Sequence, residues 1–225
     1  MNSMDVCVVA CAELFRGDGE ILASPMGPVP SLGARLARRT FAPDLVLSDG
    51  EATLLGPDGK PEGWLPYRAV FDVVAHGSRH VVMGANQIDR YGNQNISCVG
   101  PHKAPKRQLL GVRGAPGNTV NHRTSYWVPK HSPRVFVSAV DVVSGVGYDR
   151  DGGRFHDVYR VVTNLCVLDF GGPGHTMRVV SLHPDVTVDE VVAQTGFPLV
   201  IEDPPVTREP TAEELAILRE LDPAR

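Results

Sequence analysis

The chain has 225 residues, of which 42% are hydrophobic and 21% charged, a balance typical of a globular protein with a full hydrophobic core. Its formal net charge of -4 at pH 7 gives no overall attraction for nucleic acid or for an anionic membrane surface. No apolar run approaches membrane-spanning length. Residues 1–20 carry acids and no basic n-region, so we expect no signal peptide and a cytoplasmic protein.

The first third of the chain alternates between helical and strand-like patterns. Apolar residues at helical spacing, from Met4 to Phe15, predict an amphipathic opening helix. Residues 52–66 contain several glycines and prolines without periodicity, so we expect a loop there. Other patterns predict strands at 20–26, 44–48 and 80–85, and helices at 31–39 and 67–77.

The rest of the chain is richer in strand-like runs. Residues 98–132 are dominated by Gly, Pro, Asn, His and basic residues and show no periodic pattern. Thr187 and Thr211 each begin a capping-box sequence, which predicts a helix after each of them, and the Pro-rich segment 198–210 connects the two helices. Apolar β-rich runs separated by turn residues lie at 134–140, 158–164, 166–170 and 177–182.

This mixture of helices and short apolar strands predicts a single α/β domain over residues 1–225, with an open, mostly parallel sheet and flanking helices. In such sheets, ligands bind in the crevice beyond the carboxyl ends of the strands. Polar residues that directly follow a predicted strand are therefore the first candidates for a site.

Cysteine and histidine give little sign of metal or nucleophile chemistry. The cysteines are scattered without a zinc-ligand spacing, so we expect small buried side chains and no structural metal. No histidine stands beside a Ser or Cys in a nucleophile motif, and we expect most of them on the surface or in loops. The residues concerned are Cys7, Cys11, Cys98, Cys166, His102, His122, His131, His156, His175 and His183.

The segment Val81–Ser97, VVMGANQIDRYGNQNIS, places many short polar side chains after a predicted strand. Gly84 lets the backbone approach a ligand closely, and carboxamides both donate and accept hydrogen bonds. Asn and Gly are also ordinary turn residues, so a purely structural role is equally open. The carboxamides are Asn86, Gln87, Asn93, Gln94 and Asn95.

Two further segments contain candidate groups. In Gly111–Tyr126, three glycines could offer backbone N–H groups to an oxyanion or a phosphate, and Arg113 and Arg123 could pair with an anion. This segment lacks GxGxxG and GK[ST], so an ordinary surface loop remains an alternative. In Leu47–Gly56, two acids follow a strand end, although Asp49-Gly50 is also a common turn pair.

Four stretches together resemble the β subunit of family I coenzyme A transferases, the glutaconate type included. They are VVMGANQIDRYGNQNIS, GVRGAPGN, YRVVTNLCVLDF and SLHPDVTVDEVVAQTGF, and the resemblance covers nearly the whole chain. It implies the open α/β sheet of that superfamily and an α subunit of related fold as partner, with α2β2 as the expected stoichiometry. It also implies no cofactor other than the coenzyme A carried by the substrate.

In that family, a glutamate in an SENG-like turn attacks the acyl-CoA thioester. The matching turn here is Ser48-Asp49-Gly50-Glu51, with Asp49 at the glutamate position. Asp is one methylene shorter, and a displacement of about 1 Å can cost on the order of a hundredfold in rate. The whole pattern is most similar to a narrower group, the β subunits of ring-cleaving hydrolases of steroid catabolism, which use water to open a ring of a CoA-linked cyclic β-dicarbonyl compound.

The resemblance suggests which residues form the site, because water attack and C–C cleavage require a general base and donors for two oxyanions. We expect Asp49 to orient groups by hydrogen bonding, without forming an anhydride. A CoA transferase that uses Glu51 or Asp49, and a non-catalytic scaffold subunit, remain alternatives. The expected catalytic residues are Asp49, Asn93, Asn95 and Asn118, and those expected to bind substrate or CoA are Gly84, Gln87, Arg113, Gly114 and Gly117.

Overall fold

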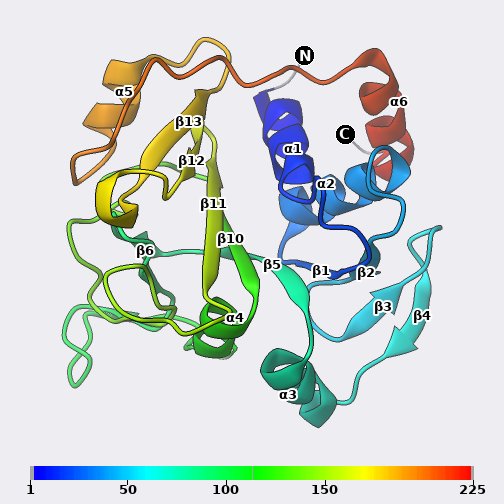
Figure 1. The fold of residues 1–225 in the computed structure, drawn as a ribbon, viewed down its shortest axis with the longest axis horizontal. Helices are drawn as coiled ribbons and strands as arrows, with labels where there is room; N and C mark the ends of the chain where they lie inside the picture. The colour runs from blue at the N-terminus through cyan, green and yellow to red at the C-terminus, as the bar shows by residue number, and fades with distance from the viewer. Residues whose placement is uncertain (1–2, 113, 224–225) are drawn as a thin grey trace.

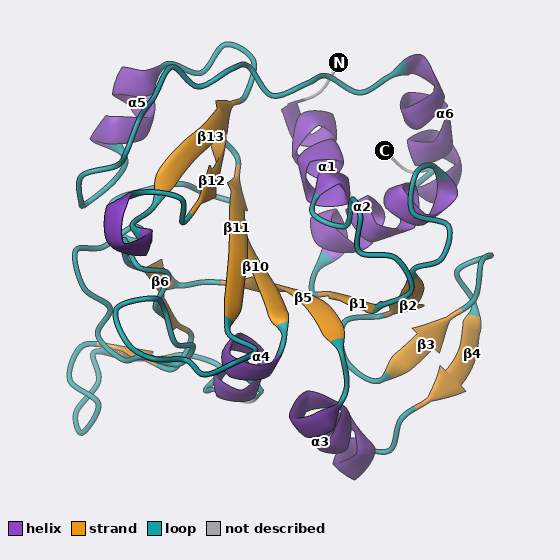
Figure 2. Ribbon diagram, in the orientation of Figure 1, coloured by secondary structure: helices purple, strands orange, loops and turns teal. Residues whose placement is uncertain are grey.

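Helices cover both faces of one large β-sheet (Figures 1 and 2). The structure, a computed structural model, describes residues 3–112 and 114–223. Within these ranges, no helix is long and apolar enough to cross a membrane. The helices are α1 (Ser3–Glu13), α2 (Pro28–Arg39), α3 (Tyr67–His76), α4 (Ala115–Asn121), the 3-10 turn η1 (Pro173–His175), α5 (Val188–Ala193) and α6 (Ala212–Leu221).

The large sheet has nine strands in the order β13-β12-β11-β10-β5-β1-β2-β3-β4. Its five central strands, β11 to β2, run parallel. Two more strands follow on each side, and each of them pairs antiparallel with the strand before it. The prediction of a mostly parallel α/β sheet with flanking helices is confirmed. Its strands are β1 (Leu22–Pro25), β2 (Val46–Ser48), β3 (Thr53–Leu55), β4 (Pro61–Trp64), β5 (Arg79–Gly84), β10 (Arg123–Val128), β11 (Asp157–Thr163), β12 (Cys166–Asp169) and β13 (Arg178–Leu182).

Short strand pairs form two small separate sheets next to the large one. β6 (Gln87–Ile88) pairs with β7 (Gln94–Asn95), and β8 (Cys98–Val99) pairs with β9 (Arg107–Gln108). The β6–β7 pair lies in the segment directly after β5, so the polar residues of that segment form a compact structured loop.

The central strands are apolar in sequence because both faces of the sheet are covered. Along β5, Val81 and Met83 belong to one hydrophobic cluster and Val82 belongs to the other. The cluster around Val82 lies under α1 and α2, and also includes Ile217 of α6. The cluster on the other face includes Ala115 of α4, and α4 packs against α3.

The opening helix exists, but the prediction that it is amphipathic is wrong. All seven residues from Val6 to Ala12 are buried. α1 packs on α2 and also contacts β11, so apolar side chains are needed around the helix and not along one stripe. Cys7, Cys11, Cys98 and Cys166 are all buried, and none of them forms a disulfide.

Two predictions about loops are also wrong. Residues 52–66, predicted as a loop, contain β3 and β4, which pair as an antiparallel hairpin at the edge of the sheet. Residues 111–126, treated as a glycine-rich loop, contain α4 and most of β10. β10 is a central strand, and it lacked a clear pattern because the polar Thr124 and Ser125 precede its aromatic residues.

The run 134–140 was predicted as β-rich, but it contains no strand. Its backbone makes a single bridge, between Phe136 and Ile88. Phe136 is buried and stacks on His131 with ring centroids 3.7 Å apart. Packing of the aromatic side chain therefore explains the apolar character of this run.

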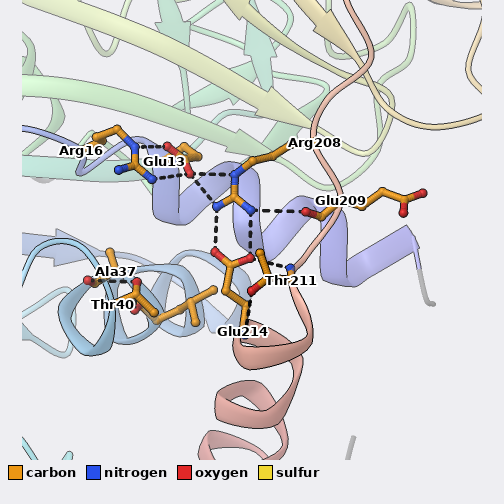
Figure 3. A network of polar contacts seen from close by, with 9 residues as sticks. Glu13, Arg16, Ala37, Thr40, Arg208, Glu209, Thr211 and Glu214 are labelled. Carbon is orange, nitrogen blue, oxygen red and sulfur yellow. Dashed lines mark hydrogen bonds and ion pairs between the residues drawn. The ribbon is translucent and has the colours of Figure 1, made fainter.

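A network of ion pairs fastens the C-terminal helix to the first helix (Figure 3). The Arg208 guanidinium donates to both carboxylate oxygens of Glu214, at 2.7 and 2.8 Å, and to Glu13 at 2.6 Å. Thr211 and Glu214 complete the capping box predicted at the start of α6. At the start of α5, the Thr187 hydroxyl accepts from the Glu190 N–H, as predicted for its cap.

Candidate functional site

The carboxyl ends of β2, β1 and β5 lie next to one another, because these three strands are parallel neighbours. The turn Ser48–Glu51 follows β2, and the segment Gly84–Asn95 follows β5. Two of the predicted site segments therefore meet at one edge of the sheet, where ligands of open α/β sheets bind.

Asp49 holds the turn after β2 together. Its Oδ1 accepts hydrogen bonds from the backbone N–H groups of Glu51, Ala52 and Thr53, at 2.8, 2.9 and 3.1 Å. Partial burial raises the pKa of Asp49, but these hydrogen bonds outweigh burial and leave its pKa below the ordinary value. The carboxylate is therefore ionised at neutral pH, and one of its oxygens is already engaged.

The next residue, Gly50, is required by the geometry of the turn. Its φ is +91°, and a Cβ at this position would lie within clash distance of the carbonyl oxygen of Pro25, at the end of β1. The turn is also tied to the sheet by Ser48, whose Oγ accepts from the Gly50 N–H and donates to the carbonyl of Ala23. Asp49 is thus presented on a turn that is fixed against the neighbouring strand.

The carboxamide side chains after β5 make hydrogen bonds within their own loop and to neighbouring segments. Asn93 is buried; its amide donates to Asp89 and Asp149, both at 2.9 Å, and its oxygen accepts from the Gly147 N–H. Asn95 is equally buried. Its amide donates to Gln87 Oε1 at 2.7 Å and to the carbonyl of Cys98 at 2.8 Å.

Gln87 connects this loop to a more distant segment. Its Oε1 accepts from the Asp141 N–H at 3.0 Å, and its amide donates to the Asp141 carboxylate at 2.9 Å. The side chains of Gln87, Asn93 and Asn95 thus have protein partners, and they give the loop a fixed shape. Direct contact between any of them and a substrate stays a prediction.

Gly84 is the most open of the predicted residues at this edge. It is exposed at the end of β5, and an added Cβ would meet no atom within 4 Å. Its carbonyl accepts a hydrogen bond from the Gln94 side chain, which links β5 to β7. The backbone here can therefore approach a ligand while the loop holds it in place.

The predicted residues of α4 lie on a face of the sheet and not in a loop. Asn118 is buried, accepts a hydrogen bond from Arg79 and donates to the sulfur of Met83 at 3.3 Å. At Gly117, a Cβ would lie 2.6 Å from Cγ1 of Val74, so glycine allows α4 to pack closely on α3. At Gly114 an added Cβ would make only ordinary contacts, and Arg113 lies outside the described residues.

A buried polar chain that the sequence analysis missed joins the turn after β2 to α4. The hydroxyls of Ser48 and Ser24 lie 3.3 Å apart, and Arg79 donates to Ser24 at 3.5 Å and to Asn118. The exposed fractions of Ser24 and Arg79 are only 1% and 4%. The available signal was an arginine next to the apolar run Val81–Met83 of a buried strand.

Most histidines were expected on the surface or in loops. His122, His131 and His183 do lie outside helices and strands, but they are buried. His131 lies between the hydroxyls of Thr163 and Thr195, and His183 bonds to Thr207 and to the carbonyl of Thr163. Burial lowers the pKa of His131 to about 4, which keeps its ring neutral.

A family model described as coenzyme A transferase matches residues 70–194. The chain is 58% identical to the cholesterol ring-cleaving hydrolase IpdB subunit of Rhodococcus jostii (strain RHA1), over 97% of this chain and 92% of that protein. It is 30% identical to a subunit of the 3-oxoadipate CoA-transferase of Pseudomonas knackmussii, over 98% of this chain and 93% of that protein.

Its fold matches the crystal structure of Rhodococcus jostii RHA1 IpdAB with a TM-score of 0.94. The match has 57% sequence identity and covers 100% of this chain and 96% of that chain. Sequence and fold agree along nearly the whole length, and the chain belongs to the coenzyme A transferase family.

Proposed function

We propose that this chain is the β subunit of a heteromeric hydrolase of steroid catabolism. The enzyme would open the last carbocyclic ring of a CoA-linked cyclic β-dicarbonyl compound with water, together with an α subunit of related fold in an α2β2 assembly. The observation that supports this most strongly is the 58% identity, over 97% of the chain, to a subunit named as a cholesterol ring-cleaving hydrolase. The proposed location is the cytoplasm.

The proposed reaction begins when water adds to a ring ketone. The C–C bond of the adduct then breaks, and the electron pair passes into an enolate that the neighbouring thioester stabilises. Such a reaction requires a general base and hydrogen-bond donors placed at two oxyanions, and no covalent nucleophile. Coenzyme A enters as part of the substrate, and we propose no other cofactor.

The turn after β2 supports the use of water. A carboxylate that attacks a thioester must be free to leave its partners, but Asp49 Oδ1 accepts three backbone hydrogen bonds. A lowered pKa also makes a carboxylate a poorer nucleophile. We therefore assign Asp49 a positioning role: it fixes the turn that faces the substrate.

The remaining predicted residues receive different roles in this proposal. The open backbone at Gly84 would contact the CoA ester, while Gln87, Asn93 and Asn95 would hold the loop that carries it. Asn118 would act through Arg79 and the buried chain that reaches Ser48. The general base would come from the α subunit.

A CoA transferase is the second candidate. It is favoured by the 30% identity to a 3-oxoadipate CoA-transferase and by Glu51, a longer exposed acid in the same turn. A transferase forms an acyl anhydride on a carboxylate, whereas the proposed hydrolase does not. The two reactions therefore differ in what they leave on the peptide that contains the turn.

The experiment uses the complex of both subunits with the CoA-linked cyclic dicarbonyl substrate in ¹⁸O-labelled water. The proposal predicts one ¹⁸O atom in the new carboxylate of the opened product and, after hydroxylamine quenching, no modified acid in the peptide around Ser48–Glu51. A hydroxamate on Asp49 or Glu51, with CoA passed to an added carboxylic acid, would establish the transferase instead.

A further inference from the structure

A pocket of about 280 Å³ opens at the other edge of the sheet, where the parallel strands begin. Arg79 begins β5, Arg123 begins β10 and Asp157 begins β11, and all three line this pocket. The turn after β2 and the segment after β5 lie at the carboxyl ends of the strands. The pocket therefore lies away from the proposed reaction, and only Arg79 also belongs to the buried chain that reaches Ser48.

Arginine outnumbers acid in the lining of the pocket. It contains three arginines and one acid, Asp157, together with two histidines. That acid is already paired with Arg123, which donates to it at 2.8 Å and to Asp18 at 3.0 Å. The basic residues are Arg79, His122, Arg123, Arg154 and His156.

Arg79 carries a charge that no acid balances. Within residues 3–112 and 114–223, no carboxylate lies within ion-pair distance of its guanidinium, and its Nε has no hydrogen-bond partner. Burial lowers the pKa of Arg79 to about 10, which still leaves it charged at neutral pH. A buried cation without a counter-ion is costly, so an anionic partner would stabilise it.

His122 provides a second, independent sign of an absent partner. It is 2% exposed, and neither of its ring nitrogens makes a hydrogen bond of normal geometry; the carbonyl of Val74 lies close enough only to favour its protonated form weakly. Burial and the charge of Arg79 lower the pKa of His122 to about 4. The neutral ring of His122 has one N–H that can be donated to a ligand. Nε2 of His156, which also lines the pocket, lacks a hydrogen-bond partner as well.

The mouth of the pocket suits a small anion. Arg154 is exposed there and has no acid partner among the described residues, and its guanidinium lies 5.3 Å from the ring centroid of the exposed Phe155. Arginine is well suited to phosphate because its planar group donates several parallel hydrogen bonds.

We infer that this pocket binds a phosphate dianion, either the free ion or a phosphate monoester. Its oxygens would accept from Arg79, from the ring N–H of His122 and from Arg154 at the mouth. Inorganic phosphate and the 3′-phosphate of coenzyme A share this chemistry, and the experiment distinguishes these sources. The inference rests on the pocket alone and does not depend on the hydrolase reaction.

The test is calorimetric titration of the complex of both subunits with inorganic phosphate, coenzyme A and dephospho-CoA, in a buffer free of oxyanions. The exposed Arg154 is replaced in R154Q, which should fold normally, and the buried histidine is replaced in H122F, which has no side-chain N–H to donate. R219Q is the matched control, because Arg219 is an exposed arginine of α6 that does not line the pocket.

We expect one site per β subunit for phosphate, about tenfold weaker binding in R154Q and H122F, and unchanged binding in R219Q. Tighter binding of coenzyme A than of dephospho-CoA, with phosphate as a competitor, would identify the 3′-phosphate as the source. Binding of phosphate alone would identify the free ion. Failure of phosphate to bind the wild-type complex, or equal binding by R154Q, H122F and R219Q, would overturn the inference.

Discussion

At the scale of single residues, the hydrogen bonds of the Asp49 carboxylate explain how the turn after β2 differs from a turn that carries a glutamate nucleophile. The shorter side chain of Asp49 reaches back to three N–H groups of its own turn. This is the local hydrogen bonding for which Asp is favoured in turns. A carboxylate that accepts hydrogen bonds from its own turn can fix the shape of a site, but it is poorly placed to attack a thioester.

Substitution of Asp49 separates the positioning role from acid–base chemistry. In D49N the amide oxygen can still accept the three N–H bonds, so we expect ring-opening activity within about tenfold of wild type; loss of a general base would cost about 10²–10⁴-fold. In D49A the turn loses its acceptor, and a shift of about 1 Å would lower kcat by on the order of a hundredfold. Steady-state kinetics of both complexes test this, and equal losses in D49N and D49A would contradict it.

Gly50 should tolerate no side chain. Alanine would have to adopt a φ of +91°, which costs about 1–2 kcal/mol, and its Cβ would meet the backbone oxygen of Pro25, which adds about 1–3 kcal/mol of strain. The matched control is G19A, because Gly19 also has a positive φ, +67°, but has no atom within 4 Å of an added Cβ. The midpoint of thermal unfolding of the complex should fall further for G50A than for G19A. Equal shifts would show that the close contact carries no cost.

The candidate site illustrates what residue types can and cannot predict. The polar residues after β2 and β5 were found from the sequence, and the parallel neighbours of the sheet bring those segments together. The burial of Asn93 and Asn95 with protein partners could not be predicted, because Asn builds turns and binds ligands with the same atoms. Arg79 was missed because its importance depends on burial and on residues distant in the chain.

At the scale of elements, runs with a clear apolar period were predicted correctly. β5, β11, β12 and β13 are examples, and so are the two capped helices α5 and α6. The hairpin β3–β4 was missed because it lies at the sheet edge, where glycine and proline are tolerated and few side chains are buried. β10 was missed because its own composition shows no clear strand pattern. It is a central strand because it pairs with β5 on one side and with β11 on the other.

One arginine links α6 to α1, in addition to the apolar packing of Ile217 and Leu218. Arg208 bridges Glu13 of α1 and Glu214 of α6, so R208M would leave both acids without this partner, at a cost of about 1–3 kcal/mol. We expect faster hydrogen–deuterium exchange in residues 212–221, measured by mass spectrometry of the complex. R39M is the control, because Arg39 makes a single exposed pair with Glu220, which is worth about 1 kcal/mol or less. Unchanged exchange of α6 in R208M would show that apolar packing alone holds this helix.

At the scale of the whole molecule, the parallel strands give the sheet two chemically different edges. The carboxyl ends carry the turn of Asp49 and the carboxamide loop, whereas the opposite edge holds the basic pocket. A buried chain of hydrogen bonds runs between the two edges: Ser48 lies at the carboxyl end of β2, Arg79 lies at the start of β5, and Ser24 contacts both. This arrangement gives the pocket a physical connection to the proposed site, made entirely of hydrogen-bonded side chains.

Buried neutral histidines should make the whole protein sensitive to mild acid. Burial, and for His122 also the charge of Arg79, lowers the pKa of His122 and of His131 to about 4 in the folded protein. In the unfolded chain these rings titrate near the ordinary value of about 6.5. Between these values the unfolded state binds more protons, so stability is fully present above about pH 6.5 and falls as the pH drops toward 4.

We therefore expect the midpoint of thermal unfolding of the complex to fall between about pH 7 and pH 4.5. H131Q should reduce this pH dependence, since Gln can still bond to the hydroxyls of Thr163 and Thr195 but does not titrate. H76Q is the control, because His76 is exposed. Burial raises the pKa of Asp89, which has the opposite effect on stability, and H131Q leaves that contribution unchanged. An identical pH profile for wild type and H131Q would show that His131 takes up its proton without unfolding.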